Sequence, residues 1–202
     1  MIKSRVSYIS KVAIFSALSA VLYAWVKFPL SFMFPSFLEM NFCNIPVYIS
    51  GFALGPVGGA SVVIFRTLLK LLFVGTGTSY VGELSDMIIG LFVVLSSSIF
   101  YRFHKTRKGG IIAILIGTGV WVGGALIANW LVIVPAYIKL FFNGDVSIFL
   151  NLLKIIPNIT VDNYMWKYLL YACLPFNALL SIVVGLVTFL IYKKISQLLQ
   201  KF

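Results

Sequence analysis

The sequence is poor in acidic residues and in charge of any kind. Only five of its 202 residues are Asp or Glu, and charged residues make up 10% of the chain, against about 25% in typical globular proteins. Hydrophobic residues make up 61%, above the usual range of about 45–50%. Because so few polar residues cannot cover the surface of a soluble fold, this composition predicts an integral membrane protein.

Cysteine and histidine are also scarce. Cys43 and Cys173 lie far apart and form no CxxC motif, and the single histidine is His104. Since zinc sites and disulfide frameworks need closely spaced sets of these residues, we expect no metal site. The chain also has no HExxH, GxSxG or GK[ST] motif, so it shows no catalytic residues and no loop for nucleotide phosphates. The sequence therefore predicts a protein that is not an enzyme and that carries no cofactor.

Long apolar runs are what the sequence has in abundance. Unpaired backbone groups are costly in hydrocarbon, so such runs form helices or closed barrels, and these runs lack the alternation of barrel strands. We therefore predict an all-α integral membrane protein, with residues 1–202 as a single membrane domain. Its six transmembrane helices are expected at about 6–26, 45–54, 60–74, 83–101, 110–141 and 168–192.

The basic residues, which give a formal charge of +11, indicate an orientation. Short cytoplasmic loops of membrane proteins are rich in Lys and Arg. Six spans with both termini in the cytoplasm place ten of the sixteen bases on that side: Lys3, Arg5, Lys11, Arg102, Lys105, Arg107, Lys108, Lys193, Lys194 and Lys201. We therefore expect a multi-pass protein of the cell membrane, whose bases contact the lipid bilayer surface and do not bind nucleic acid.

Four charged residues fall where hydrocarbon is expected. Arg66 and Lys70 are four residues apart, so they share a helical face, and each would cost about 2.5–3.5 kcal/mol at a lipid-facing helix centre. That face must therefore look inward. Glu83 and Asp86 similarly share a face at the outer end of the next predicted helix. Two compatible interpretations remain: the four neutralise one another, or at least one of them contacts a substrate.

Uncharged polar and aromatic residues near the same outer helix ends complete the candidate substrate site. An amide in an apolar helix needs a hydrogen-bonding partner, either on another helix or on a ligand. The candidates of this kind are Asn44, Tyr48, Asn129, Trp130 and Asn177. The segment that ends at Asn44, residues 27–44, is rich in Phe and interrupted by proline. This composition fits either a lid or an interfacial aromatic belt.

The first predicted helix carries small residues at a regular spacing. Ala13 and Ala17 form an AxxxA pair, and Ala20 and Ala24 repeat it. Small residues at this spacing let a second helix approach closely. The strip serves either internal packing or the docking of a partner membrane protein.

Several segments resemble one family, the substrate-binding S components of energy-coupling factor (ECF) vitamin transporters, and are most similar to the riboflavin-specific subunits. The segments are FLEMNFCNIPVYISGFALGPVGG, GTGTSYVGELSDMIIG, the basic loop ending KTRKGG, ANWLVIVPAY and LPFNALLS. The resemblance implies a six-helix subunit that captures one vitamin from outside and topples in the membrane during transport. It also implies docking, through Ala13 and Ala17, on a transmembrane coupling subunit with two ATPase subunits, which hydrolyse the ATP.

Carried over to this sequence, the resemblance places ligand contacts at Asn129, at Asn177, in the lid before Asn44 and in the loop before Glu83. Two positions depart from the riboflavin pattern. Leu180 stands where a lysine is common, three positions after the sixth-span asparagine, and Asp86 stands where an asparagine is common.

Three functional hypotheses follow. Riboflavin suits aromatic walls such as Trp130, Tyr48 and Phe176, and the resemblance favours it. Pantothenate carries a carboxylate, which suits the planar guanidinium of Arg66. The third hypothesis belongs to another class: a non-transporting membrane scaffold subunit, which predicts complete pairing of the inward charges and no cavity.

Overall fold

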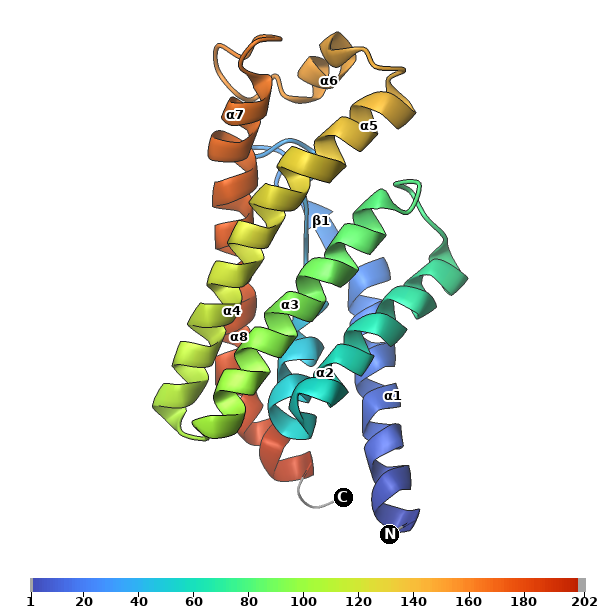
Figure 1. Ribbon diagram of the computed structural model, residues 1–202, viewed down its shortest axis with the longest axis vertical. Helices are drawn as coiled ribbons and strands as arrows, with labels where there is room; N and C mark the ends of the chain where they lie inside the picture. Colours follow the sequence, from blue (N-terminus) through green and yellow to red (C-terminus); the bar gives the residue numbers. More distant parts are fainter. Residues whose placement is uncertain (1, 200–202) are drawn as a thin grey trace.

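The computed structural model describes residues 2–199, and the surroundings of side chains for residues 5–192. Of the bases used above, Lys201 lies outside the described residues, as do the side chains of Lys3, Lys193 and Lys194. The chain is mostly helical (Figure 1), and the long helical stretches are α1 (Ile2–Ala24), α2 (Asn44–Val74), α3 (Val81–Phe103), a stretch over Arg107–Phe141 and a stretch over Tyr164–Leu199. In the described part of the chain, five helices are long and apolar enough to cross a membrane.

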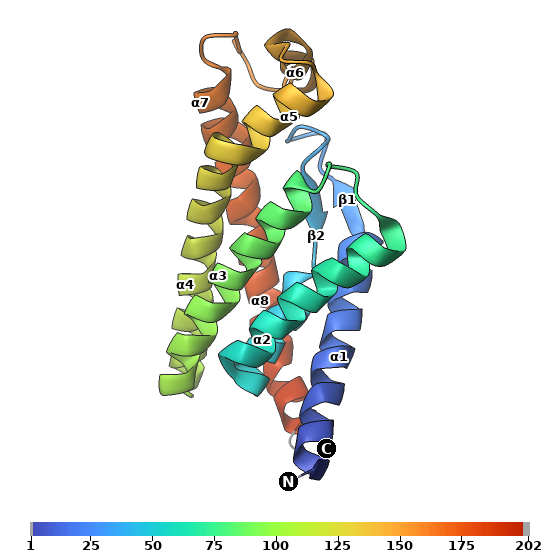
Figure 2. The same ribbon diagram turned by 45° about the vertical axis from the view of Figure 1, so that its right-hand side comes forward.

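The first and the last long helix have their outer ends at the same end of the bundle. Figures 1 and 2 show that α1 begins, and the last long helix ends, at the bottom of both views. The short connection after α3 lies at the same end, and the bases of residues 102–108 lie in it or in the helical turns on either side of it. The bases near the start of α1 and those of residues 102–108 therefore lie at the end of the bundle where the termini lie, as expected for one aqueous face of a membrane protein.

α2 consists of two helical segments that reverse direction at Gly55, whose backbone angles of φ 83° and ψ 177° are not helical. Glycine adopts this region without a side-chain clash. A Cβ at Gly59 would lie only 2.8 Å from Cα of Gly51, so the two segments touch at glycines. The sequence predicted a loop between separate helices over 45–54 and 60–74. This prediction is wrong, because only Gly55 departs from helical backbone angles. The helix resumes at Pro56, because proline is tolerated in a first helical turn.

The two remaining long stretches each contain a π-helical turn. The fourth comprises α4 (Arg107–Ala128), η1 (Asn129–Ile133) and α5 (Val134–Phe141), and the fifth comprises α7 (Tyr164–Tyr168), η2 (Leu169–Cys173) and α8 (Leu174–Leu199). Pro135 follows η1 and Pro175 follows η2. A proline in a helix lacks an N–H and crowds the carbonyl four residues earlier, so a widened turn relieves the clash. Such turns are frequent at functional sites.

The end of the bundle opposite the termini is covered by short elements (Figure 2). β1 (Lys27–Pro29) pairs antiparallel with β2 (Glu39–Asn41), and α6 (Val146–Leu152) lies between α5 and α7 in the chain. The purely helical prediction missed the strands. Pro29 and Pro35 disfavour a continuous helix through this segment. An ion pair between Lys27 Nζ and Glu39 Oε2 of 2.5 Å links the two strands.

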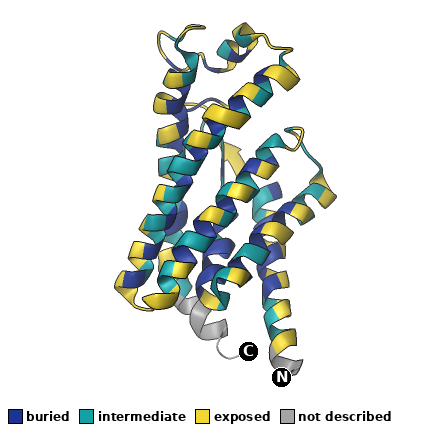
Figure 3. Cartoon of the chain, in the orientation of Figure 1, coloured by how far each residue is buried: buried dark blue, intermediate teal, exposed yellow. Residues whose placement is uncertain are grey.

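Exposed residues lie on the outward faces of the helices, and buried residues lie where helices face one another (Figure 3). Many of the exposed residues are large and apolar. Leu72, Phe92 and Leu190 have exposed fractions of 76%, 63% and 63%. An apolar surface of this extent is unusual for a soluble protein. The chain is therefore a membrane protein.

Candidate functional site

A cavity of about 360 Å³ lies near the covered end of the bundle, between α3, the α4–α5 stretch and the α7–α8 stretch. Its volume is in the range of small-molecule sites, roughly 300–1,000 Å³. Eight of the twenty lining residues are aromatic: Phe37, Trp121, Tyr137, Phe141, Phe142, Phe149, Tyr168 and Phe176. Four polar side chains also reach it: Ser85, Asp86, Asn129 and Asn177. Apolar walls with a few convergent polar groups are typical of a binding site for a small organic molecule.

The segment between the two strands closes one side of this cavity. Phe37 and Leu38 line it, and the ring centroid of Phe37 lies 6.0 Å from that of Phe149 and 5.9 Å from that of Tyr168. Phe34 is buried and packs edge-on against Phe176 at 5.4 Å. Of the two interpretations of residues 27–44, the structure favours the lid.

Asn129 and Asn177 are held in place by hydrogen bonds between helical stretches. Oδ1 of Asn129 accepts from the Tyr168 hydroxyl at 2.9 Å, and its Nδ2 donates to the Ala125 carbonyl at 2.9 Å. Oδ1 of Asn177 accepts from Trp121 Nε1 at 3.2 Å, and its Nδ2 donates to the Cys173 carbonyl at 2.8 Å. Asn129 opens η1 and Asn177 follows η2, so both amides are fixed next to widened turns and face the cavity.

Arg66 is fully buried behind the cavity wall. Its Nη1 donates to Asn44 Oδ1 at 2.6 Å and to Cys43 Sγ at 3.0 Å, and its Nη2 donates to Asp86 Oδ2 at 2.9 Å. Nε has no hydrogen-bond partner. Asp86 lines the cavity, whereas Arg66 and Asn44 do not. The structure thus brings these three candidates together and exposes only the carboxylate to the cavity.

Lys70 and Glu83 form a second pair, with 2.5 Å between Nζ and Oε1. Lys70 also donates to the Gly75 carbonyl at 2.9 Å, and Glu83 accepts from the hydroxyls of Thr76, at 3.0 Å, and Thr78. These bonds fasten the loop between α2 and α3 to the first turn of α3. The mutual neutralisation expected for the four charged residues is therefore present, and neither Lys70 nor Glu83 lines the cavity.

Tyr48 and Trp130 are not at the cavity, contrary to their prediction as aromatic walls. Tyr48 is fully buried in the core, with its ring 6.0 Å from that of Phe52. Trp130 is 47% exposed and lies 6.0 Å from Trp166. Trp130 directly follows Asn129 in η1, so its side chain leaves the helix in another direction, and Asn129 is buried where Trp130 is exposed.

Sequence reasoning did not select Trp121 or Tyr168 as site residues, and it included Phe37 only as part of the lid. A usable signal existed for the first two, because buried Trp and Tyr side chains need a partner for their polar tips. Their partners are the two asparagines that the sequence did select. Among the described residues, no group of three or more His, Cys, Asp or Glu side chains is placed to hold a metal ion.

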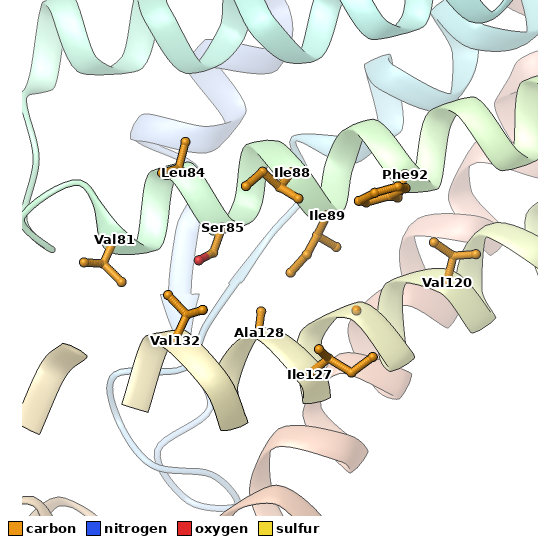
Figure 4. Close-up of a pocket in the computed structure, with 11 residues that line it drawn as sticks. Val81, Leu84, Ser85, Ile88, Ile89, Phe92, Val120, Ile127, Ala128 and Val132 are labelled. Atoms are coloured by element: carbon orange, nitrogen blue, oxygen red, sulfur yellow. The ribbon is translucent and has the colours of Figure 1, made fainter. Parts of the chain in front are cut away.

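A second hollow, of about 490 Å³, lies on the outward side between α3 and the α4–η1 stretch (Figure 4). We call it the groove. Figure 4 shows Leu84, Ile88 and Phe92 of α3 along one side, with Ala128 and Val132 along the other. Ser85 is the only lining residue with a polar side chain. The groove therefore offers no set of converging hydrogen-bonding groups.

The predicted docking strip is accessible. Ala13 and Ala17 are exposed on α1, while Val12, Phe15 and Ser16 face the bundle. The strip is therefore not used for packing inside this chain. Its second half differs, because Ala20 and Ala24 are buried.

Comparison with known proteins gives consistent matches. The family model for the ECF transporter, substrate-specific component, matches residues 7–192. Riboflavin transporter RibU of Streptococcus thermophilus is 30% identical over 94% of this chain and 83% of its own length. RibU of Staphylococcus aureus is 27% identical over 94% and 90%, and riboflavin transporter FmnP of Bacillus subtilis is 25% identical over 93% of each. The fold is similar to the solved S component of a bacterial ECF transporter, with a TM-score of 0.63, 24% identity and coverage of 96% and 98%.

Proposed function

Because this chain belongs to the family of ECF transporter substrate-specific components, we propose that it captures riboflavin from the extracellular side of the cell membrane for an ECF-type importer. The family is one of transporter subunits and not of enzymes. The observation that carries the proposal is the aromatic cavity with fixed polar groups. The relatives named as riboflavin transporters support it.

The cavity suits the two parts of riboflavin. A flat heteroaromatic ring gains from burial against aromatic side chains, which Phe37, Tyr168 and Phe176 supply. A chain of hydroxyl groups needs hydrogen-bonding partners once it leaves water, and Asp86, Asn129 and Asn177 supply these from three different helical stretches.

The alternatives receive less support. A pantothenate carboxylate would need Arg66, but this guanidinium is fully buried, and both of its terminal nitrogens are hydrogen-bonded. The carboxylate that reaches the cavity is that of Asp86, which would repel such a ligand. The scaffold hypothesis predicts that no cavity opens beneath the lid, whereas one of about 360 Å³ lies there.

The proposed topology has six crossings with both termini in the cytoplasm. Chain ends on the same side require an even number of crossings. The first segment of α2, from Asn44 to Leu54, is only about 16 Å long. Figure 2 shows β2 leading into it, and β2 with Phe42 adds roughly 13 Å. Together they approach the hydrocarbon thickness of about 30 Å, and backbone of this kind is tolerated at that depth when protein surrounds it.

The proposed partners are a transmembrane coupling subunit and two ATPase subunits, which supply the ATP hydrolysis. Ala13 and Ala17 form the proposed contact with the coupling subunit, because this small-residue strip is exposed on α1 and lets a second helix approach closely. We expect Ala17→Leu to abolish copurification with the coupling subunit while riboflavin binding persists. The matched control is Ala136→Leu, on α5, since α5 lies at the opposite end of the bundle from the start of α1. Normal copurification of the Ala17 variant would exclude the strip.

Two measurements test the proposed function. Purified protein should quench the fluorescence of added riboflavin at a one-to-one ratio. Cells should take up labelled riboflavin only when this chain and the coupling subunits are expressed together. Absence of riboflavin binding, or uptake unaffected by loss of the coupling subunits, would contradict the proposal.

A further inference from the structure

The charge of the cavity comes from a single side chain. Among the lining residues, all of them within the described part of the chain, Asp86 is the only one with a charged side chain. Its Oδ2 is taken by Arg66, and the side chain is 30% exposed. A bound ligand therefore meets a carboxylate and no ammonium, guanidinium or imidazole group.

The neighbouring cations are closed off from the cavity. Arg66 has no exposed surface, and the ring of Tyr23 lies 5.6 Å from its guanidinium carbon. On the side of α3, a Cβ at Gly90 would lie only 2.9 Å from Arg66 Nη2, so the guanidinium fills the space against that helix. Lys70 is held by Glu83 and by the Gly75 carbonyl. Neither cation reaches a ligand without breaking these contacts.

The start of α3 offers no substitute site for an anion. A helix N-terminus attracts negative charge through its free N–H groups, and Gly82 lies both in the first turn of α3 and at the cavity. However, the Gly82 N–H already donates to Thr78 Oγ1 at 3.1 Å. The same turn carries the carboxylate of Glu83, which satisfies the preference of the helix end for negative charge.

We propose that Asp86, with Arg66 sealed behind it, makes this cavity select uncharged riboflavin against phosphorylated flavins. The inference rests on the proposed function. A phosphate group entering the cavity loses its water, finds no cation, and is repelled by a carboxylate in surroundings where charges are weakly screened. Like charges placed together at a binding site are a strong means of excluding a wrong partner. Asp86 is thus a specificity-determining residue, and the aromatic walls and asparagines supply most of the affinity.

The test compares the binding of riboflavin and riboflavin 5′-phosphate to purified protein by quenching of flavin fluorescence. We expect the phosphate ester to bind the unaltered protein at least about tenfold more weakly. In the double variant Asp86→Asn/Arg66→Gln, which removes the carboxylate and its counter-ion together, riboflavin itself should bind somewhat more weakly, because Asp86 lines the cavity. The ratio of the two dissociation constants, that of the phosphate ester over that of riboflavin, should fall several-fold. The single variant Asp86→Asn should also lower this ratio of dissociation constants. It leaves Arg66 without its acidic partner and could misfold for that reason, which the double variant avoids. Asp162→Asn, at an exposed loop position, removes the same charge and should leave the ratio unchanged.

Equal binding of both flavins to the unaltered protein, or a ratio unchanged in the double variant, would overturn the inference and leave the proposed function standing. If riboflavin does not bind at all, the proposed function fails, and pantothenate and thiamine then test the inference separately. Binding of anionic pantothenate would overturn it. Binding of cationic thiamine without pantothenate would uphold the charge selection.

Discussion

The cavity and the groove are neighbours with opposite chemistry. Ser85 and Ile89 line both, so one stretch of α3 forms a wall of each. The groove is the larger, at about 490 Å³ against about 360 Å³. It has one hydroxyl group, however, while the cavity has a carboxylate and two amides fixed by hydrogen bonds. Volume alone would select the wrong hollow, and fixed polar groups identify the site.

The helical repeat of α3 explains how one helix serves both. Leu84, Ile88 and Phe92 follow each other at intervals of four residues and are exposed, so they form an apolar stripe toward lipid. Glu83 and Asp86 lie on the side of α3 that faces α2. Their partners there, Lys70 and Arg66, have side chains that are 12% and 0% exposed. The apolar face of α3 is therefore turned toward lipid, and its charged face is turned toward the interior of the bundle and the ligand.

The largest expected effect concerns the charge behind the cavity. Arg66→Met removes the partner of Asp86 and leaves its carboxylate uncompensated. Breaking a fully buried pair by removing one partner costs about 3–5 kcal/mol. Because the side chain of Asp86 is 30% exposed, the loss should lie below that range, and the midpoint of thermal unfolding in detergent should still fall. Lys105→Met, in the exposed loop between α3 and α4, should have little effect. Equal unfolding midpoints for the two variants would contradict this account.

A smaller effect is expected for an amide that lines the cavity. Asn177→Leu removes a ligand contact and leaves Trp121 Nε1 without its acceptor, and an unmet buried hydrogen bond costs about 1–3 kcal/mol. Riboflavin binding should weaken by about tenfold, measured by fluorescence quenching. The same substitution at Asn151, which is exposed on α6, serves as the control. Unchanged affinity in the Asn177 variant would remove this residue from the site.

The lid should show the smallest of these effects. Phe37→Ala removes one ring that covers the ligand and contacts Phe149 and Tyr168. Since affinity differences between related complexes lie mostly in the dissociation rate, riboflavin should leave roughly three- to tenfold faster in a stopped-flow experiment. Phe32→Ala, at a position that is 77% exposed in the same segment, is the matched control. Identical dissociation rates would mean that the segment does not cover the ligand.

Local spacing in the sequence predicted the helical faces well. The apolar runs gave the positions of the long helices, and the interval between Arg66 and Lys70 correctly turned both residues inward. Asn129 and Asn177 were selected because an amide in an apolar run needs a partner, and both lie at the cavity. These features follow from the spacing of residues within a single helix, so they can be predicted without knowing how the helices pack.

Features that depend on how helices meet were not predictable in the same way. Tyr48 and Trp130 were placed on the wrong surfaces, because an aromatic residue fits a core, a lipid face or a ligand wall equally well. The sequence spacing shows that Arg66 needs an acid, but it does not show that Asp86 stands between Arg66 and the cavity. That order places a carboxylate, and not a guanidinium, at the cavity and weakens the case for an anionic vitamin.

The most direct test uses one substitution at two positions of α4. Ala125 lines the cavity and Ala128 lines the groove, so Ala125→Leu fills the first hollow and Ala128→Leu fills the second. If the cavity holds riboflavin, the Ala125 variant should bind it at least about tenfold more weakly, and the Ala128 variant should bind it as the unaltered protein does. Loss of binding in the Ala128 variant with normal binding in the Ala125 variant would contradict the assignment of the site.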